Sequence, residues 1–325
     1  MTNYLSEIEW RWSIHDKLIF NSGVSYINSV ANFDEYATNQ NRKTLSLFTG
    51  FLYQPFHDWN LNFNLRKEFT NIENPPIAPS LGLQGTIIKN TLFVFGNIGR
   101  HYNLPTMNDL FWRPGGNENL KPEDAWSEEL GIILTNKNNS IPKLTVTAFN
   151  SLIDNWIKWQ PGASGIYAPN NLRQVHTNGI EMSLHFHKEI KKLQLQFNVN
   201  YTWCNSSISK TQTQQEAATI DKQLIYVPVN VLNSVLVLKY AHFSLNYNHT
   251  FTGERFVTAD NSSSLEPFQV ANITIEKAII SKKFNIHVYT KVMNVYDVTY
   301  QVLAYRPMPG RWFSIGIKFD LILKQ

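Results

Sequence analysis

Two histidines, His185 and His187, stand two residues apart in an alternating segment, which places both imidazoles on one face of a strand. Imidazole nitrogens ligate zinc, copper, iron and nickel, so the pair could bind a metal ion or orient a metal chelate. No third ligand stands at a suitable spacing, and lumen histidines are often merely hydrated. We therefore expect no resident metal and no cofactor.

Aromatic residues form two groups that could contact a ligand, because their rings supply a large apolar area and some carry a polar atom. The candidates are Phe111, Trp112, Arg113, Trp156, Trp159 and Tyr167. Trp156 and Trp159 could equally belong to an aromatic girdle at a membrane interface.

Catalytic motifs are absent from the sequence. GxSxG, HExxH and GxxxxGK(S/T) do not occur, and the single cysteine, Cys204, excludes an internal disulfide and a CxxC zinc site. Serine, histidine and asparagine are too frequent to single out a triad. The sequence therefore predicts a protein that is not an enzyme.

Composition points to a membrane barrel. Charged residues make up 17% and aromatic residues 13% of the 325 residues, which suits a lipid-facing surface with aromatic girdles. The net charge of +4 comes from scattered lysines and arginines, so no basic stripe indicates a nucleic-acid partner. No apolar run approaches the ~18 residues of a membrane helix, and the first twenty residues lack the basic, apolar, small-residue order of a signal peptide, so we expect an exported protein to carry its signal on further sequence. We expect lipid to be a partner.

The elements that must position these side chains are strands. Apolar and polar residues alternate strictly over 193–203, and again over 59–66, 243–251 and 284–292. Many such segments run to roughly 10–14 residues, which is longer than soluble strands and long enough to cross a bilayer. A soluble β-sandwich with one wet face is the alternative for this pattern.

Short and long connections alternate along the chain, as in barrels with tight periplasmic turns and long outer loops. Tight turns are predicted at 15–17, 55–58, 137–142 and 188–192, and irregular stretches at 31–43, 103–125, 160–173 and 205–227. The count gives about fifteen strands, and an odd number does not suit a closed antiparallel barrel. We therefore expect a piece of a larger barrel.

One segment resembles TonB-dependent outer-membrane receptors, whose barrels carry Pro-Ser/Thr-x-x-Glu/Asp-Leu, then Gly-Asn-x-x-Leu-Lys-Pro-Glu and Glu-x-Gly. The matching residues are Pro105, Thr106, Asp109, Leu110, Gly116, Asn117, Leu120, Lys121, Pro122, Glu123, Glu129 and Gly131. An Asn-rich loop at 167–171 followed by a strand that starts at Gly179 and Glu181 adds to the match.

The end of the chain resembles the same family. Its closing element ends in Pro309, Gly310 and Arg311. Four further residues fit the last-strand signal that the barrel-assembly machinery reads, namely Ser314, Gly316, Phe319 and Leu321.

The resemblance implies that residues 1–325 form the C-terminal part of an all-β, antiparallel transmembrane β-barrel, about 15 of the family's 22 strands. The N-terminal plug and first strands would be absent, so the chain alone would not transport. The family implies outer-membrane import of a siderophore-iron, haem, cobalamin or glycan ligand in a Gram-negative bacterium, coupled to TonB–ExbB–ExbD through the plug. A plug-less outer-membrane adhesin or enzyme barrel is the alternative.

Overall fold

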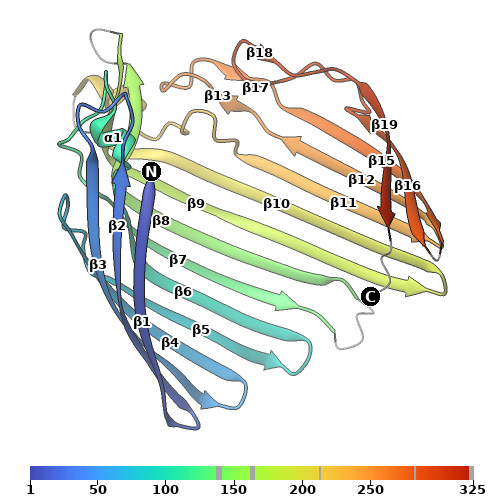
Figure 1. Cartoon of the computed structure of the whole chain (residues 1–325), viewed down its shortest axis with the longest axis horizontal. Coiled ribbons are helices and arrows are strands. Elements are labelled where there is room, and N and C mark those ends of the chain that lie inside the picture. The colour runs from blue at the N-terminus through green and yellow to red at the C-terminus, as the bar shows by residue number, and fades with distance from the viewer. Residues whose placement is uncertain (137–140, 162–164, 212–213, 282, 322–325) are drawn as a thin grey trace.

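The computed structural model describes residues 1–136, 141–161, 165–211, 214–281 and 283–321. One antiparallel sheet of 15 strands dominates it, and nearly every strand pairs with its neighbours in the chain (Figure 1). Its strands, in spatial order, are β1 (Thr2–His15), β2 (Leu18–Ala31), β3 (Gln40–Phe56), β4 (Trp59–Thr70), β5 (Ala78–Ile88), β6 (Leu92–Asn103), β7 (Glu123–Leu134), β8 (Lys143–Pro161), β9 (Tyr167–Ile190), β10 (Leu193–Lys210), β11 (Asn230–Tyr240), β12 (Phe243–Thr252), β15 (Phe268–Ile280), β16 (Phe284–Met293) and β19 (Trp312–Leu321). The predicted all-β antiparallel class is confirmed.

The remaining elements lie in the connections. They are α1 (Met107–Phe111), the 3₁₀ helix η1 (Gln214–Thr219), and two small sheets that pair β13 (Arg255–Phe256) with β14 (Ser264–Leu265) and β17 (Gln301–Leu303) with β18 (Arg306–Pro307). Among the described residues, no helix has the length and apolar character of a membrane span.

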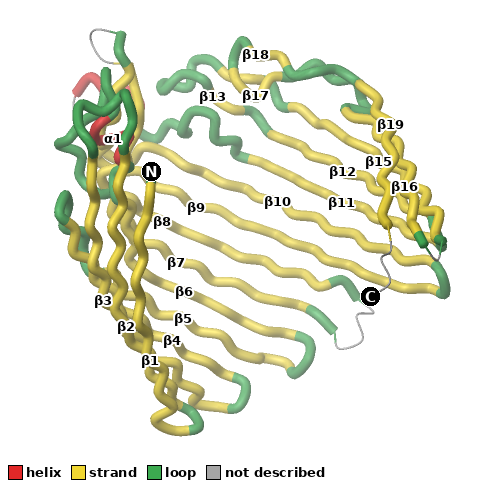
Figure 2. Tube along the Cα trace, in the orientation of Figure 1, coloured by secondary structure: helices red, strands yellow, loops and turns green. Residues whose placement is uncertain are grey.

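The register of neighbouring strands places the apolar residues of one strand opposite apolar residues of the next. Phe197 on β10 lies opposite Phe186 on β9 and Leu236 on β11, and Leu236 lies opposite Tyr247. Because directly opposed residues in an antiparallel pair share a face, these apolar residues form one row, and the intervening polar residues form rows on the other face. The strands form one curved layer (Figure 2). Its two faces differ in polarity because of this register.

A two-layer sandwich is excluded by this arrangement. Leu195, Phe197 and Val199, which a sandwich would seal in a dry centre, are at most half-buried. Instead, several of the fully buried residues lie in the connections, for example Leu110 and Leu120, each 1% exposed. Along the described part of the sheet, β1 and β19 form the two outer edges and do not pair with each other.

Two predictions about the connections are wrong. The expected irregular stretch at 160–173 is mostly a paired hairpin, since β8 and β9 continue their ladder up to Pro161 and Tyr167. Gly179 therefore lies in the middle of β9 and not at a strand start. Pro161 and Pro169 fit in this hairpin because they lie near the outer ends of β8 and β9, where proline is tolerated. The turn predicted at 137–142 falls largely outside the described residues.

Candidate functional site

Helix α1 is positioned by a capping box in the connection between β6 and β7. The hydroxyl of Thr106 accepts from the N–H of Asp109 (3.1 Å), and the Asp109 carboxylate accepts from the N–H of Thr106 (2.8 Å). Two otherwise unpaired backbone donors of the helix start are thereby satisfied. The other carboxylate oxygen of Asp109 accepts from the indole of Trp159 on β8 (2.7 Å). The cap is therefore tied to the β8–β9 hairpin.

Residues after α1 dock on the same hairpin. The amide of Asn117 donates to the carbonyl of Pro169 (3.0 Å). Gly115 has φ of +122°, and a Cβ there would lie 2.3 Å from the carbonyl oxygen of Tyr167. A side chain at this position would break the contact, so the close approach requires glycine.

Lys121 and Glu123 complete the docking. The backbone N–H of Lys121 donates to the side chain of Asn171 (2.9 Å), which in turn donates to the carbonyl of Lys121 (3.0 Å). The carboxylate of Glu123 accepts from the N–H of Ile157 on β8 (2.7 Å) and from the amide of Asn103 (3.0 Å). Connection 104–122 is thus held by hydrogen bonds to β3, β8 and β9. Asn171 lies on a strand where a loop was expected.

The connection between β2 and β3 packs against α1 from the other side. Tyr36, 6% exposed, donates to the side chain of Asn108 and contacts the ring of Phe111 with 6.3 Å between centroids. Burial, and then the carboxylates of Glu35 and Asp109, raise the pKa of the Tyr36 hydroxyl. Tyr36 therefore stays neutral and keeps its donor hydrogen over the physiological range.

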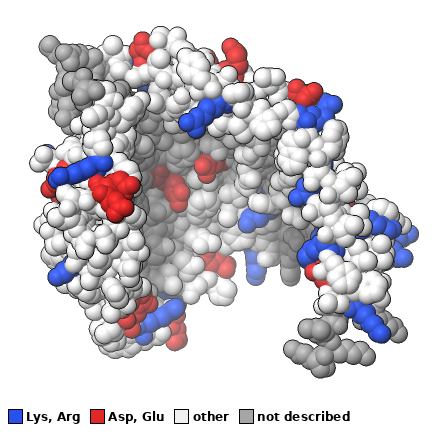
Figure 3. All heavy atoms as spheres, turned by 45° about the horizontal axis from the view of Figure 1, so that its top comes forward, with Lys and Arg blue, Asp and Glu red and all other residues white. Residues whose placement is uncertain are grey.

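A basic pocket of about 490 Å³ opens next to this connection. It is lined by residues of β3, β4, β5 and β6 and of the chain that leads to α1, among them Arg42, Arg66, Glu68, Arg100 and Tyr102. In the space-filling view the sheet surrounds a hollow whose wall carries both blue and red side chains (Figure 3).

Two arginines of the pocket are oriented by carboxylate partners. Arg66 donates to Glu68 (2.7 and 2.9 Å) and to the buried hydroxyl of Ser46 (3.1 Å). Two guanidinium nitrogens of Arg100 donate to both oxygens of Asp124 (2.8 and 2.5 Å). The forked Arg100–Asp124 pair fixes the plane of that guanidinium group, whereas both nitrogens of Arg66 share one oxygen of Glu68.

Arg42 is the arginine with donor capacity left over. Its Nη2 donates to the carbonyl of Pro105, but its buried Nε has no partner among the described residues. A buried donor without an acceptor is rare in proteins and suits a site that a ligand completes. Arg42 and Arg66 lie on the polar face, where the neighbouring carboxylate of Glu68 offsets only one of their two charges, so this side of the pocket favours an anion, whereas Arg100 belongs to the other face by register and is engaged by Asp124.

The aromatic candidates are divided by the structure. Phe111 and Trp112 pack on the buried cluster of Ala31, Tyr36 and Met107, whereas Trp156 packs on a separate cluster formed by Val175, Ile208 and Leu224. Arg113 and Tyr167 are exposed, and Trp159 is 36% exposed beside Gly115. Arg113, Trp159 and Tyr167 thus stay accessible to a ligand near the docked connection.

Signature glycines in the strands admit large rings. A Cβ at Gly131 would lie 2.3 Å from the ring of Phe95, and one at Gly316 would lie 2.3 Å from the ring of Tyr289.

Near the end of the chain, Asn294 donates to the carbonyl of Pro309 (3.3 Å), and the N–H of Arg311 donates to Asp297 (2.8 Å). Phe319 stacks on Phe284 with 5.6 Å between centroids.

The histidine pair lies in a separate pocket with Lys143 and Asn198. His185 bonds to Asn198 (2.7 Å), and His187 lies 3.6 Å from Glu189. Among the residues that the structure describes, no group of three or more candidate ligands could hold a metal.

Sequence reasoning missed Arg42, Arg66 and Arg100. They stand far apart in the chain and gather only where β3, β4 and β6 reach the same end of the sheet. Arg66 could have been found from the sequence, because it is a charged residue on the polar side of the alternating segment 59–66 and therefore faces away from the apolar side chains.

Comparisons with known proteins agree on one family. The family model described as TonB dependent receptor-like, beta-barrel matches residues 3–295. The chain is 23% identical over 294 residues to the vitamin B12 transporter BtuB of Photobacterium profundum, covering 89% of this chain and 45% of that protein. It is 35% identical over 91 residues to BtuB of Vibrio vulnificus, covering 27% of this chain and 14% of that protein.

Solved structures share the fold. The ferric enterobactin receptor PfeA of Pseudomonas aeruginosa, a Q482A mutant in complex with enterobactin, superposes with a TM-score of 0.74 at 17% identity. The siderophore receptor PirA of Acinetobacter baumannii gives 0.73 at 14% identity. Each match covers 98% of this chain and 54% of the known structure. The chain therefore spans about half the length of the proteins it resembles.

Proposed function

We propose that this chain, which belongs to the TonB-dependent receptor family, forms the passage and part of the ligand site of an outer-membrane importer for an anionic metal chelate. The observation that supports this proposal best is the basic pocket with Arg42 and Arg66 on its polar side, where the buried Nε of Arg42 has no partner among the described residues. Siderophore–iron complexes with carboxylate or catecholate oxygens have the matching chemistry. Arg113, Trp159 and Tyr167 would supply further contacts at the rim.

A direct binding measurement tests this ligand class. We expect a negatively charged ferric chelate to bind the protein, and Arg42→Gln to weaken binding about tenfold or more through loss of a charged hydrogen bond. Arg306→Gln, in the distant β17–β18 connection, is the matched control and should change little. Unchanged affinity in Arg42→Gln would exclude the pocket as the ligand site.

Vitamin B12 is the second candidate ligand. It is supported by the names of the two BtuB relatives, which are vitamin B12 transporters. Vitamin B12 has no net charge, so its binding should depend little on ionic strength, whereas binding of an anionic chelate should weaken as salt screens the arginines. Titration with both ligands at low and high salt separates the two.

We further propose that a plug domain and further strands act with this chain, and that TonB–ExbB–ExbD acts on the plug. Support comes from the share of each relative that the chain covers, about half. The last-strand residues Ser314, Gly316, Phe319 and Leu321 would be read by the barrel-assembly machinery. Uptake that persists after loss of TonB would favour the alternative, a plug-less barrel with another activity.

A further inference from the structure

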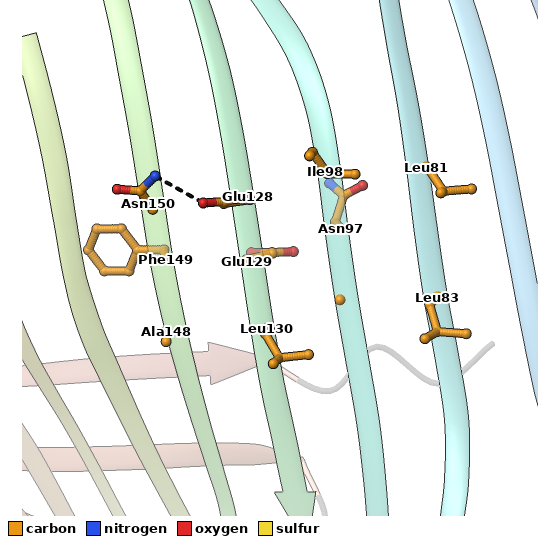
Figure 4. A pocket seen from close by; sticks show the side chains of 11 residues that line it. Leu81, Leu83, Asn97, Ile98, Glu128, Glu129, Leu130, Ala148, Phe149 and Asn150 are labelled. Atoms are coloured by element: carbon orange, nitrogen blue, oxygen red, sulfur yellow. Dashed lines mark hydrogen bonds between the residues drawn. The ribbon is translucent and has the colours of Figure 1, made fainter.

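The apolar face of the sheet carries a polar chain where lipid would be expected. Nε2 of His176 on β9 donates to the side-chain oxygen of Asn150 on β8 (2.6 Å), and the Asn150 amide donates to Glu128 on β7 (3.0 Å). Register places Glu128 opposite Ile98 and Asn150, and in the next row Leu130 lies opposite Gly96 and Ala148. Glu128 therefore shares a face with Leu130, while Glu129 points to the other side (Figure 4).

A carboxylate on a lipid-facing surface is costly unless it is paired, and such groups usually mark a function. Among the described residues, Glu128 has no cation within ion-pair distance. The arginine two residues along this face from Ile98, Arg100, is engaged by both oxygens of Asp124. Asn150 occupies one acceptor position of Glu128, and since Glu128 is exposed its remaining lone pairs are free for a donor.

An apolar groove adjoins the carboxylate. It has a volume of about 480 Å³, and its lining includes Leu81, Leu83, Ile98 and Leu130 around the small residues Gly96 and Ala148 (Figure 4). Since Gly96 and Ala148 have little or no side chain, the leucines stand above them as walls. The width and apolar character suit a hydrocarbon chain.

The order of polar and apolar residues along these strands indicates which way a lipid in the groove would point. Leu83, Gly96, Leu130 and Ala148 lie on the short-turn side of Glu128 and Asn150, and the next residues of this face, such as Ile132, are also apolar. A lipid would thus place its head group toward the long connections and its acyl chain toward the short turns. That is the orientation of a lipid in the outer leaflet.

We propose that Glu128, Asn150 and the adjoining groove bind an outer-leaflet glycolipid of the lipid A type whose head group carries a primary amine, such as a phosphoethanolamine substituent. The ammonium group would donate to Glu128, and one acyl chain would lie over Gly96 and Ala148. This site lies on the opposite face from Glu129, and it is independent of which ligand the receptor imports.

Native mass spectrometry of the protein, purified from the outer membrane as it occurs there, tests the site. The probes are lipid A with a phosphoethanolamine substituent, the same lipid A without it, and phosphatidylethanolamine. We expect the substituted lipid A to be retained about tenfold better than the unsubstituted form, as suits one charged hydrogen bond. This comparison needs no variant, so a folding defect cannot obscure it.

Variants assign the effect to residues. Glu128→Gln keeps the shape and an acceptor for Asn150 but removes the charge, and should reduce the preference to below about twofold. Glu129→Gln, the neighbour on the opposite face, should keep it. Ala148→Leu fills the groove and should lower retention of both lipid A forms alike. Equal retention of both forms, a preference that survives Glu128→Gln, or better retention of phosphatidylethanolamine would each overturn the proposal.

Discussion

The indole N–H of Trp159 donates to Oδ1 of Asp109 across 2.7 Å, although the two residues stand 50 positions apart in the chain. The same carboxylate caps α1 through its other oxygen. One side chain therefore both starts the short helix and fixes it to the β8–β9 hairpin. The orientation of connection 104–122 beside the basic pocket depends on this link.

Replacing Asp109 should loosen this connection. Asp109→Ala removes the capping box and the acceptor of Trp159, and we expect a loss of about 1–3 kcal/mol in local stability. Hydrogen exchange of residues 106–111 should accelerate accordingly. Glu118→Ala, an exposed residue of the same connection, is the control. Equal hydrogen-exchange rates of residues 106–111 in Asp109→Ala and Glu118→Ala would contradict the role given to Asp109.

Asn171→Ala should free the connection from the hairpin while α1 stays capped. The variant loses the exposed reciprocal pair with the Lys121 backbone and leaves the part-buried carbonyl of Asn155 without the Asn171 amide that donates to it (2.6 Å), which costs about 1–3 kcal/mol. Limited proteolysis should then cut within 112–122 faster than in the parent protein. Asn170→Ala, which removes a long, local hydrogen bond of 3.4 Å to the carbonyl of Ala168, should not change the cutting rate.

The two faces of β10 should respond differently to charge. Phe197→Arg places a guanidinium on the lipid face and should destabilise the barrel by about 2–4 kcal/mol if it lies near the bilayer midplane. Gln196→Arg places it on the opposite, wet face and should cost little. Equilibrium unfolding from lipid vesicles measures both, and similar losses would mean that the faces are assigned wrongly.

Gly316→Ala should impair the last strand. Its added Cβ would meet the ring of Tyr289, which must rotate away from the position it fills on β16. We expect a stability loss of about 1–3 kcal/mol from overpacking. A second change, Tyr289→Ala, removes the obstructing ring, so Gly316→Ala made in that background should cost much less. A double-mutant cycle in heat-dependent gel mobility shows whether the two effects couple.

At alkaline pH the Tyr36 hydroxyl should ionise and lose the hydrogen bond that it donates to Asn108. Its folded-state pKa lies above the ordinary 10.0 because of burial first and then Glu35 and Asp109. Stability from the neutral hydroxyl is therefore fully present below pH 10 and is lost as pH rises through the folded-state pKa. Ultraviolet titration of the parent protein and of Tyr36→Phe should differ by one tyrosine that ionises above pH 10, and a difference at the ordinary tyrosine pKa would contradict the assignment.

The strands and their two faces follow from the sequence alone. Alternation over segments such as 193–203 fixes which side chains share a face, because the period of a strand is two residues, and a shift by one would turn every apolar residue inward. The number of strands in the sheet and the antiparallel order also follow, since each short turn joins neighbours. The continuation of β8 and β9 into 160–173 did not follow from the sequence, because the tolerance of proline in a strand depends on its position in the sheet.

Only the tertiary structure decided where the long connections go. Arg42 and Arg66 line one pocket because β3 and β4 reach the same end of the sheet, and Asp109 reaches Trp159 because the β8–β9 hairpin lies beside α1. Glu128 forms its polar chain with Asn150 and His176 through register across β7, β8 and β9. Local sequence sets the period of each strand, whereas relative register and loop docking arise from contacts between distant segments, which no local pattern encodes.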